Sequence, residues 1–149
     1  MTENRNLAEA QRWLRQALHD RDAARLNRDH GFHEHACFLA QQSAEKALKA
    51  FLYARGEGPV IGHSTLSLIL ECADQEAAFS PLQDACRRLD QLYIPTRYPN
   101  GLPGNIPHEF YNRPLADQAL SDLDSVLGCV RRFVSLAGPP PGSGNDPES

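Results

Sequence analysis

The apolar residues of this chain recur every three or four positions along most of its length, and this spacing limits the fold more than any other feature. Such a period places apolar side chains along one face of an α-helix, whereas a half-buried strand needs strict alternation. No alternation of useful length is present. We therefore expect an all-α domain of about five helices, with Trp13 in its core. The expected helices span residues 7–29, 33–55, 64–73, 81–94 and 114–137.

Residues with special backbone preferences mark the ends of these helices. Asn6, with a glutamate three positions later, forms a capping-box pattern and predicts the start of the first helix. Gly56 suits the left-handed conformation that ends a helix, and Ser64, or the threonine after it, suits the cap of the third helix. Pro81 is typical of a first helical turn, and Pro95 should end the fourth helix at the residue before it.

Residues 95–113 are rich in proline and glycine and are expected to form a long irregular loop before the last helix. A connection of about twenty residues without regular structure is unusual within a domain and more often functional than passive. Residues 138–149 are also rich in proline and glycine and otherwise polar. We therefore expect one domain over residues 1–137, followed by a disordered tail.

Charge and cysteine usage argue against several functional classes. The 149 residues carry 15 basic and 19 acidic side chains, a net charge of -4, which disfavours non-specific binding to long polyanions or anionic lipid. There is no apolar run of membrane-spanning length and no signal-peptide pattern, so we expect a cytoplasmic protein without membrane contact. The four cysteines lack metal-binding or redox spacing and are expected to be buried thiols.

Arg97 and Tyr98 stand side by side in the proline-rich loop and are the first candidates for ligand binding. A guanidinium can bind a phosphate while an adjacent aromatic ring stacks on a base. Arg97 could equally tie the loop to a carboxylate on a helix. The sequence leaves both alternatives open.

A polar strip in the second expected helix is the other candidate. Gln42, Glu45, Lys46 and Lys49 lie three or four residues apart and therefore share one side of the helix. The two lysines are the only ones in the chain and could neutralise a di- or triphosphate. The alternative is a solvated face on which a Glu45–Lys49 pair contributes about 0.2–0.5 kcal/mol.

Histidines near residue 30 do not predict a metal site. His30, His33 and His35 have carboxylates nearby, but side chains two apart on a helix point to different sides. His63 is expected to orient the turn before the third helix rather than to perform acid–base chemistry. We therefore expect neither a metal nor a cofactor.

Three segments form a pattern along the chain: Cys37–Ala50 (CFLAQQSAEKALKA), a leucine-rich helix opened by His63, and Tyr93–Pro99 (YIPTRYP). The pattern resembles the HEPN domain family, named for its occurrence in higher eukaryotes and prokaryotes and its proposed nucleotide binding. The loop Thr96–Pro103 also resembles that of the HEPN domain in the chaperone-like protein sacsin. The resemblance covers residues 7–137 and implies an antiparallel up-and-down helical bundle and frequent homodimerisation. It also implies either nucleotide binding or pairing with a small nucleotidyltransferase-type protein.

Many HEPN proteins are ribonucleases, so the resemblance implies that their catalytic motif could be present in this chain. They use an arginine and a histidine with four to six residues between them and a polar residue directly after the arginine. Here Arg97 is followed by Tyr98, and ten residues separate it from His108. Arg28 and His33 have four residues between them but lie between the first two expected helices, the wrong part of the domain. The ribonuclease motif is therefore absent from the place it should occupy.

The sequence thus predicts a homodimeric, toxin–antitoxin-like module that binds a nucleotide or RNA and has no demonstrable catalytic motif. One anion-accepting surface is predicted to combine Arg97, Tyr98, Lys46 and Lys49. Gln42 and Glu45 are further candidate ligand-binding residues. Two alternatives stay open. One is a HEPN-type ribonuclease or toxin in which the loop brings Arg97 and His108 together, and the other is a partner subunit of a minimal nucleotidyltransferase.

Overall fold

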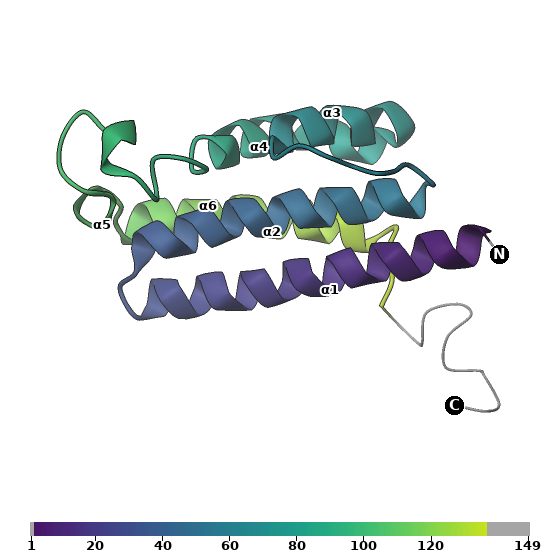
Figure 1. The fold of residues 1–149 in the computed structure, drawn as a ribbon, viewed down its shortest axis with the longest axis horizontal. Coiled ribbons are helices and arrows are strands. Elements are labelled where there is room, and N and C mark those ends of the chain that lie inside the picture. The colour runs from purple at the N-terminus through teal and green to yellow at the C-terminus, as the bar shows by residue number, and fades with distance from the viewer. Residues whose placement is uncertain (1, 137–149) are drawn as a thin grey trace.

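The chain passes through six α-helices in residues 2–136, the part that the computed structural model describes, and no strand occurs there (Figure 1). The helices are α1 (Thr2–Asp29), α2 (His33–Ala54), α3 (Thr65–Gln75), α4 (Gln83–Asp90), α5 (Pro107–Phe110) and α6 (Arg113–Arg131), with 3₁₀ turns at Ala77–Leu82 and Pro99–Gly101. The expected all-α fold is confirmed, and α5 is an additional four-residue helix in the proline-rich loop. The expected tail at 138–149 lies outside the described residues. None of the described helices is long and apolar enough to cross a membrane.

α1 and α2 form an antiparallel pair whose interface is built largely from small residues (Figure 1). Buried alanines recur along α1 at Ala10, Ala17 and Ala24, and alanines are frequent among the buried residues of α2. Small side chains let two helix backbones approach closely. The Ser43 hydroxyl of α2 accordingly reaches across and donates to the Ala17 carbonyl oxygen of α1 at 2.6 Å. Gly31, at φ 84°, supplies the left-handed conformation in the short turn between the two helices.

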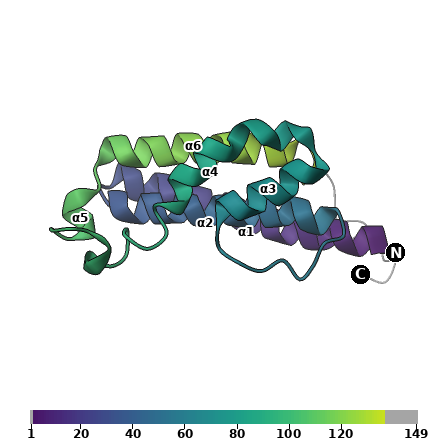
Figure 2. The same cartoon turned by 90° about the horizontal axis from the view of Figure 1, so that it is seen from above.

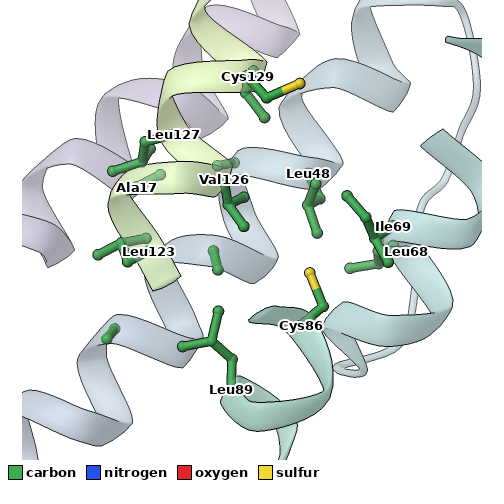
Figure 3. Close-up of a cluster of buried hydrophobic side chains, with 14 of the residues drawn as sticks. Ala17, Leu48, Leu68, Ile69, Cys86, Leu89, Leu123, Val126, Leu127 and Cys129 are labelled. Carbon is green, nitrogen blue, oxygen red and sulfur yellow. The ribbon is translucent and has the colours of Figure 1, made fainter. Parts of the chain in front are cut away.

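The centre of the core lies where α2, α3, α4 and α6 meet (Figure 3). Leu48, Ile69, Leu89 and Val126, one from each helix, are fully buried there. These residues belong to the apolar stripes that the three-and-four spacing identifies. The spacing predicts the buried face of α2, α4 and α6 correctly, whereas in α3 Leu70, which the spacing also places on the inner face, is 44% exposed.

All four cysteines are free and buried, as the sequence predicts. Burial raises the pKa of the Cys37 and Cys86 thiols to about 12. Because the thiolate rather than the thiol is the nucleophile and metal ligand, these side chains act as small apolar core residues.

Residues 55–64, which we call the return segment, carry the chain back along α2, so that α3 runs in roughly the same direction as α2 (Figures 1 and 2). Gly56, at φ 85°, ends α2 as expected. By residue 63 the chain has returned to the side of Gln41, whose side-chain amide donates to the His63 carbonyl oxygen at 2.8 Å. Ser64 then caps α3, its hydroxyl accepting from a backbone amide at 3.1 Å. The return segment is therefore held against the middle of α2.

The outer ends of α1 and α6 differ from the expected ones. α1 begins at Thr2, so the capping-box pattern at Asn6 lies inside the helix. α6 ends at Arg131 rather than near residue 137. Beyond that point the backbone tightens, and the Phe133 ring packs edge-on against Phe51 at 5.7 Å between ring centroids. Packing against the core thus ends α6 before its apolar period runs out.

The ends of α4 also differ from expectation. The chain first forms the 3₁₀ turn Ala77–Leu82, so α4 starts at Gln83 and ends at Asp90 rather than at residue 94. After α4 the backbone turns, and the Tyr93 ring stacks on His63 with 5.3 Å between centroids. An aromatic contact with the return segment therefore replaces the last expected helical turn.

The carboxylate of Asp90, at the end of α4, holds the start of α3. It accepts hydrogen bonds from the backbone amides of Thr65 at 2.7 Å and Leu66 at 3.1 Å, and from the hydroxyls of Ser64 at 2.7 Å and Thr65 at 2.6 Å. Amides in the first turn of a helix have no partners within that helix. A side chain from α4 therefore satisfies the first turn of α3 and fixes the two helices against each other.

We expect Asp90→Ala to lower the free energy of unfolding by at least about 1.5–3 kcal/mol, because it removes hydrogen bonds to a charged acceptor. Asp84→Ala is the matched control on the same helix, since this exposed carboxylate pairs with Arg87 at the surface, and we expect a change within about 0.5 kcal/mol. Urea denaturation of both variants measures the difference. Equal losses in the two variants would show that Asp90 does not hold α3.

Candidate functional site

Arg97 lies in the proline-rich loop with its guanidinium among three aromatic rings, which we call the Arg97 cage. The guanidinium carbon is 4.5 Å from the centroid of Phe38, 4.6 Å from that of Tyr93 and 5.2 Å from that of Tyr98. Its Nε donates to the Tyr93 carbonyl oxygen at 2.8 Å. Each such cation–π contact contributes about 0.5–1 kcal/mol at an exposed site. Within residues 2–136 Arg97 has no carboxylate partner, so it does not tie the loop to a helix acid as one alternative supposes.

Tyr93 joins the Arg97 cage to the return segment. One side of this residue lies against Phe38 of α2, with 6.2 Å between ring centroids, and its ring stacks on His63 at 5.3 Å. Three parts of the chain that are distant in sequence therefore meet here: α2, the return segment and the loop that follows α4.

A buried ion pair lies next to His63. The Glu45 carboxylate accepts from Lys49 Nζ at 3.1 Å, and its other oxygen is 3.2 Å from His63 Nδ1. Glu45 and Lys49 are only 4% and 5% exposed, whereas the His63 side chain is 62% exposed. Buried charges are tolerated only when they are paired. The alternative of a solvated Glu45–Lys49 face therefore does not hold.

The two glutamines before Glu45 hold the return segment as well. Gln41 is fully buried and donates to the His63 backbone. Gln42 in turn donates to the Gln41 side-chain oxygen at 2.9 Å. The Gln-Gln-x-x-Glu block of α2 thus secures both the backbone and the imidazole of His63.

Lys46 faces a different side of α2. Lys46 follows Glu45 by one position, which turns its side chain by about 100° around the helix axis. Its ammonium therefore points toward α1, where it pairs with Asp20. Arg97 and Tyr98 are in direct contact, and Lys49 is joined to them through other side chains. Of the six residues proposed from sequence, Arg97 and Tyr98 therefore lie in the loop, and the four on α2 do not share one surface, because Lys46 pairs with Asp20 while Lys49 pairs with Glu45.

Sequence reasoning assigned no role to Phe38 or Tyr93. Phe38 precedes Gln42 by four residues and Glu45 by seven, a spacing that places all three on one face. Tyr93 belongs to the YIPTRYP segment that carries the family resemblance. These two signals could have identified both rings as neighbours of Arg97.

His108, on α5, docks one turn away from the Arg97 cage. Its Nδ1 is 3.2 Å from both carboxylate oxygens of Glu34, a buried residue of α2. Glu34 precedes Phe38 by four residues, so His108 and Arg97 rest on adjacent turns of the same helix. The buried carboxylate orients an imidazole whose side chain is 59% exposed.

The histidines near residue 30 do not converge on a metal site. In the part of the chain that the structure describes, no three His, Cys, Asp or Glu side chains are placed to hold an ion. His35 instead lies 3.9 Å from Glu34 and stacks on Phe32.

Comparisons with known proteins agree with this fold. The model of the HEPN domain family matches residues 10–137. The chain is similar to TT1696 from Thermus thermophilus, with 37% identity and a TM-score of 0.80, over 84% of this chain and 98% of that one. It is also similar to ST0689, an archaeal HEPN homologue, with 32% identity and a TM-score of 0.71, over 85% of this chain and 98% of that one. No curated protein sequence matches the chain significantly. The resemblance predicted from three sequence segments is confirmed.

We expect Glu45→Ala to lower the free energy of unfolding by about 3–5 kcal/mol, because it leaves the Lys49 ammonium buried without its partner. The double variant Glu45→Ala/Lys49→Met removes both charges, and we expect it to recover most of the loss. Urea denaturation of the wild type, the single variant and the double variant measures this recovery. If the double variant is no more stable than the single one, Glu45 does not compensate the buried charge of Lys49.

Proposed function

The chain belongs to the HEPN domain family, and from this premise we propose that it binds the phosphate of a nucleotide or of an RNA end through Arg97. The observation that supports this proposal most is the exposure and the incomplete hydrogen bonding of the Arg97 guanidinium. It is exposed and oriented by three rings, and among the described residues its only hydrogen bond is through Nε. The terminal amino groups of an arginine form a fork that matches phosphate oxygens.

Tyr98 supplies the second contact in this proposal. The residue is 50% exposed and its ring lies beside the Arg97 guanidinium. An aromatic side chain next to a phosphate-binding arginine can stack on a base regardless of its identity. Binding of this kind selects for phosphate and a base more than for a particular sequence.

The helix residues act mainly by positioning the loop. Glu45 holds the His63 imidazole, Lys49 pairs with Glu45, and Gln42 supports the same segment through Gln41. The Tyr93 ring stacks on His63, and the Arg97 guanidinium lies over Tyr93. The contacts that hold His63 therefore position the Arg97 cage. Lys46 adds positive charge on the neighbouring side of α2, where it is partly exposed.

A ribonuclease or toxin that uses Arg97 and His108 is the second candidate function. One observation favours it: the buried Glu34 carboxylate orients the His108 imidazole. Glu34 lies one helical turn before Phe38, the ring that the Arg97 guanidinium contacts. A carboxylate that fixes an imidazole in this way is a common support for a general base. We nevertheless favour the binding module, because the spacing from Arg97 to His108 does not match the ribonuclease motif.

We expect Arg97→Ala to weaken binding of a 5′-phosphorylated single-stranded RNA or of a nucleoside triphosphate by about ten- to a hundred-fold, the effect of losing a charged hydrogen bond. Lys46→Ala should have a smaller effect, because the Lys46 ammonium already pairs with Asp20 on the neighbouring side of α2. Arg87→Ala, which removes an exposed arginine on α4, is the control. Isothermal titration calorimetry at two salt concentrations measures these effects, and binding should weaken as salt screens the charges.

Two outcomes of this experiment count against the binding module. One is that the wild type binds none of these ligands, or that Arg97→Ala and Arg87→Ala behave alike. The other is cleavage of the RNA by the wild type that disappears in both Arg97→Ala and His108→Ala. The second outcome would establish the ribonuclease instead.

We further propose that the module is cytoplasmic and that it is a homodimer or the partner of a nucleotidyltransferase-type protein. Large apolar side chains exposed around α5 and the neighbouring turn support association: Phe32, Ile106, Phe110 and Leu115. We expect light scattering at tens of micromolar to give the mass of two chains, since a typical specific dimer persists at that concentration. A monomer under these conditions would remove the homodimer.

A further inference from the structure

A groove between α1 and α2 forms a second concave surface, which shares none of the rings of the Arg97 cage. Its volume is about 560 Å³ and its lining consists of Glu9, Arg12, Trp13, Arg15, Gln16 and Lys46. We propose that this groove, which we call the α1–α2 groove, binds the phosphate group of a small organic phosphate. The proposal stands apart from the function proposed for Arg97.

Positive charge dominates the lining of the α1–α2 groove. Arg12, Arg15 and Lys46 face a single lining carboxylate, that of Glu9. This excess of positive charge occurs on a chain whose net charge is -4. Because Glu9 offsets Arg12 and Asp20 offsets Lys46, Arg15 supplies the positive charge in excess that a phosphate entering the groove would meet.

Arg15 is the cation best placed to hold the ligand. Among the described residues its guanidinium has no ion pair or hydrogen bond, whereas Arg12 pairs with Glu9 at 2.9 Å and Lys46 pairs with Asp20. A guanidinium carries five N–H donors in a planar fork that matches phosphate oxygens. Arg15 can therefore offer its full set of donors, and Arg12 can offer those that Glu9 leaves free.

Acidic residues hold the other polar groups of the groove in place. The Asp20 carboxylate, from a residue 6% exposed, accepts from Gln16 Nε2 at 2.9 Å and from the Lys46 ammonium. The Glu9 carboxylate accepts from the Trp13 indole nitrogen at 3.0 Å. Because these side chains are already fixed, a ligand need not order them, which reduces the entropy lost on binding.

The size of the groove and its tryptophan indicate an organic phosphate rather than phosphate alone. A volume of about 560 Å³ falls within the range of about 300–1,000 Å³ that is typical of small-molecule sites. Trp13 stacks on Tyr53 at 5.5 Å and is only partly buried, so it is not the core residue that its sequence position predicts. It offers an apolar wall beside the cations.

Trp13 also provides the measurement, because it is the only tryptophan in the chain. Its fluorescence emission is monitored while the full-length protein is titrated with phenyl phosphate, with inorganic phosphate and with acetate in parallel. We expect a saturable change with phenyl phosphate, weaker binding of inorganic phosphate, and the weakest response to acetate, which carries a single charge.

Matched variants assign the change to the groove. Arg15→Gln should weaken phenyl phosphate binding by about ten- to a hundred-fold, as expected for a lost charged hydrogen bond. Arg87→Gln, an exposed arginine on α4, and Arg97→Ala, in the Arg97 cage, should leave the affinity unchanged. Thermal unfolding of each variant shows that it is folded.

The proposal fails if phenyl phosphate gives no saturable change, if it binds no more tightly than acetate, or if Arg15→Gln binds as well as the wild type. A loss of binding in Arg97→Ala would also overturn it, because the ligand would then belong to the Arg97 cage. Since Arg97→Ala is measured separately in both experiments, failure of the groove and failure of the Arg97 proposal are distinguishable.

Discussion

The arrangement around the proposed site depends on one buried carboxylate. Glu45 is charged and almost inaccessible, and such a group is tolerated only when cations and donors surround it. Lys49 supplies one partner from the next turn of α2, and His63 supplies the other from the return segment. Tyr93 then stacks on His63, and the Arg97 guanidinium rests on Tyr93. A requirement for charge pairing inside the bundle thereby sets the position of an exposed arginine in a loop.

A second nearly buried acid has a comparable role on the other side of α2. Asp20 of α1 pairs with Lys46 and accepts from Gln16, which fixes two side chains of the α1–α2 groove. The close approach of α1 and α2, which their alanines permit, brings this acid within reach of Lys46. The two lysines of the chain, three residues apart, therefore pair with different acids.

Most of the fold could be predicted from the sequence because helical periodicity is a local property. The residues that end α2 and cap α3, Gly56 and Ser64, are where their backbone preferences indicate. The predicted ends of α4 and α6 are wrong because aromatic rings beyond them turn away to pack on other segments. Asp90 is a further contact that local patterns do not predict. It lies at the end of α4, and its carboxylate accepts hydrogen bonds from the first turn of α3.

From the amino-acid pattern alone one can predict that the protein is helical, which face of most helices is buried, that it resembles the HEPN family, and that Arg97 and Tyr98 lie in a long loop. Three features follow from the tertiary structure instead: Lys46 pairs with Asp20, the Glu45–Lys49 pair is buried, and three rings surround Arg97. The physical reason is that these contacts join positions far apart along the chain: Lys46 meets an acid 26 residues earlier, and His63 meets one 18 residues earlier. Periodicity assigns a side chain to a face, but burial and the return path of the chain determine what it meets there.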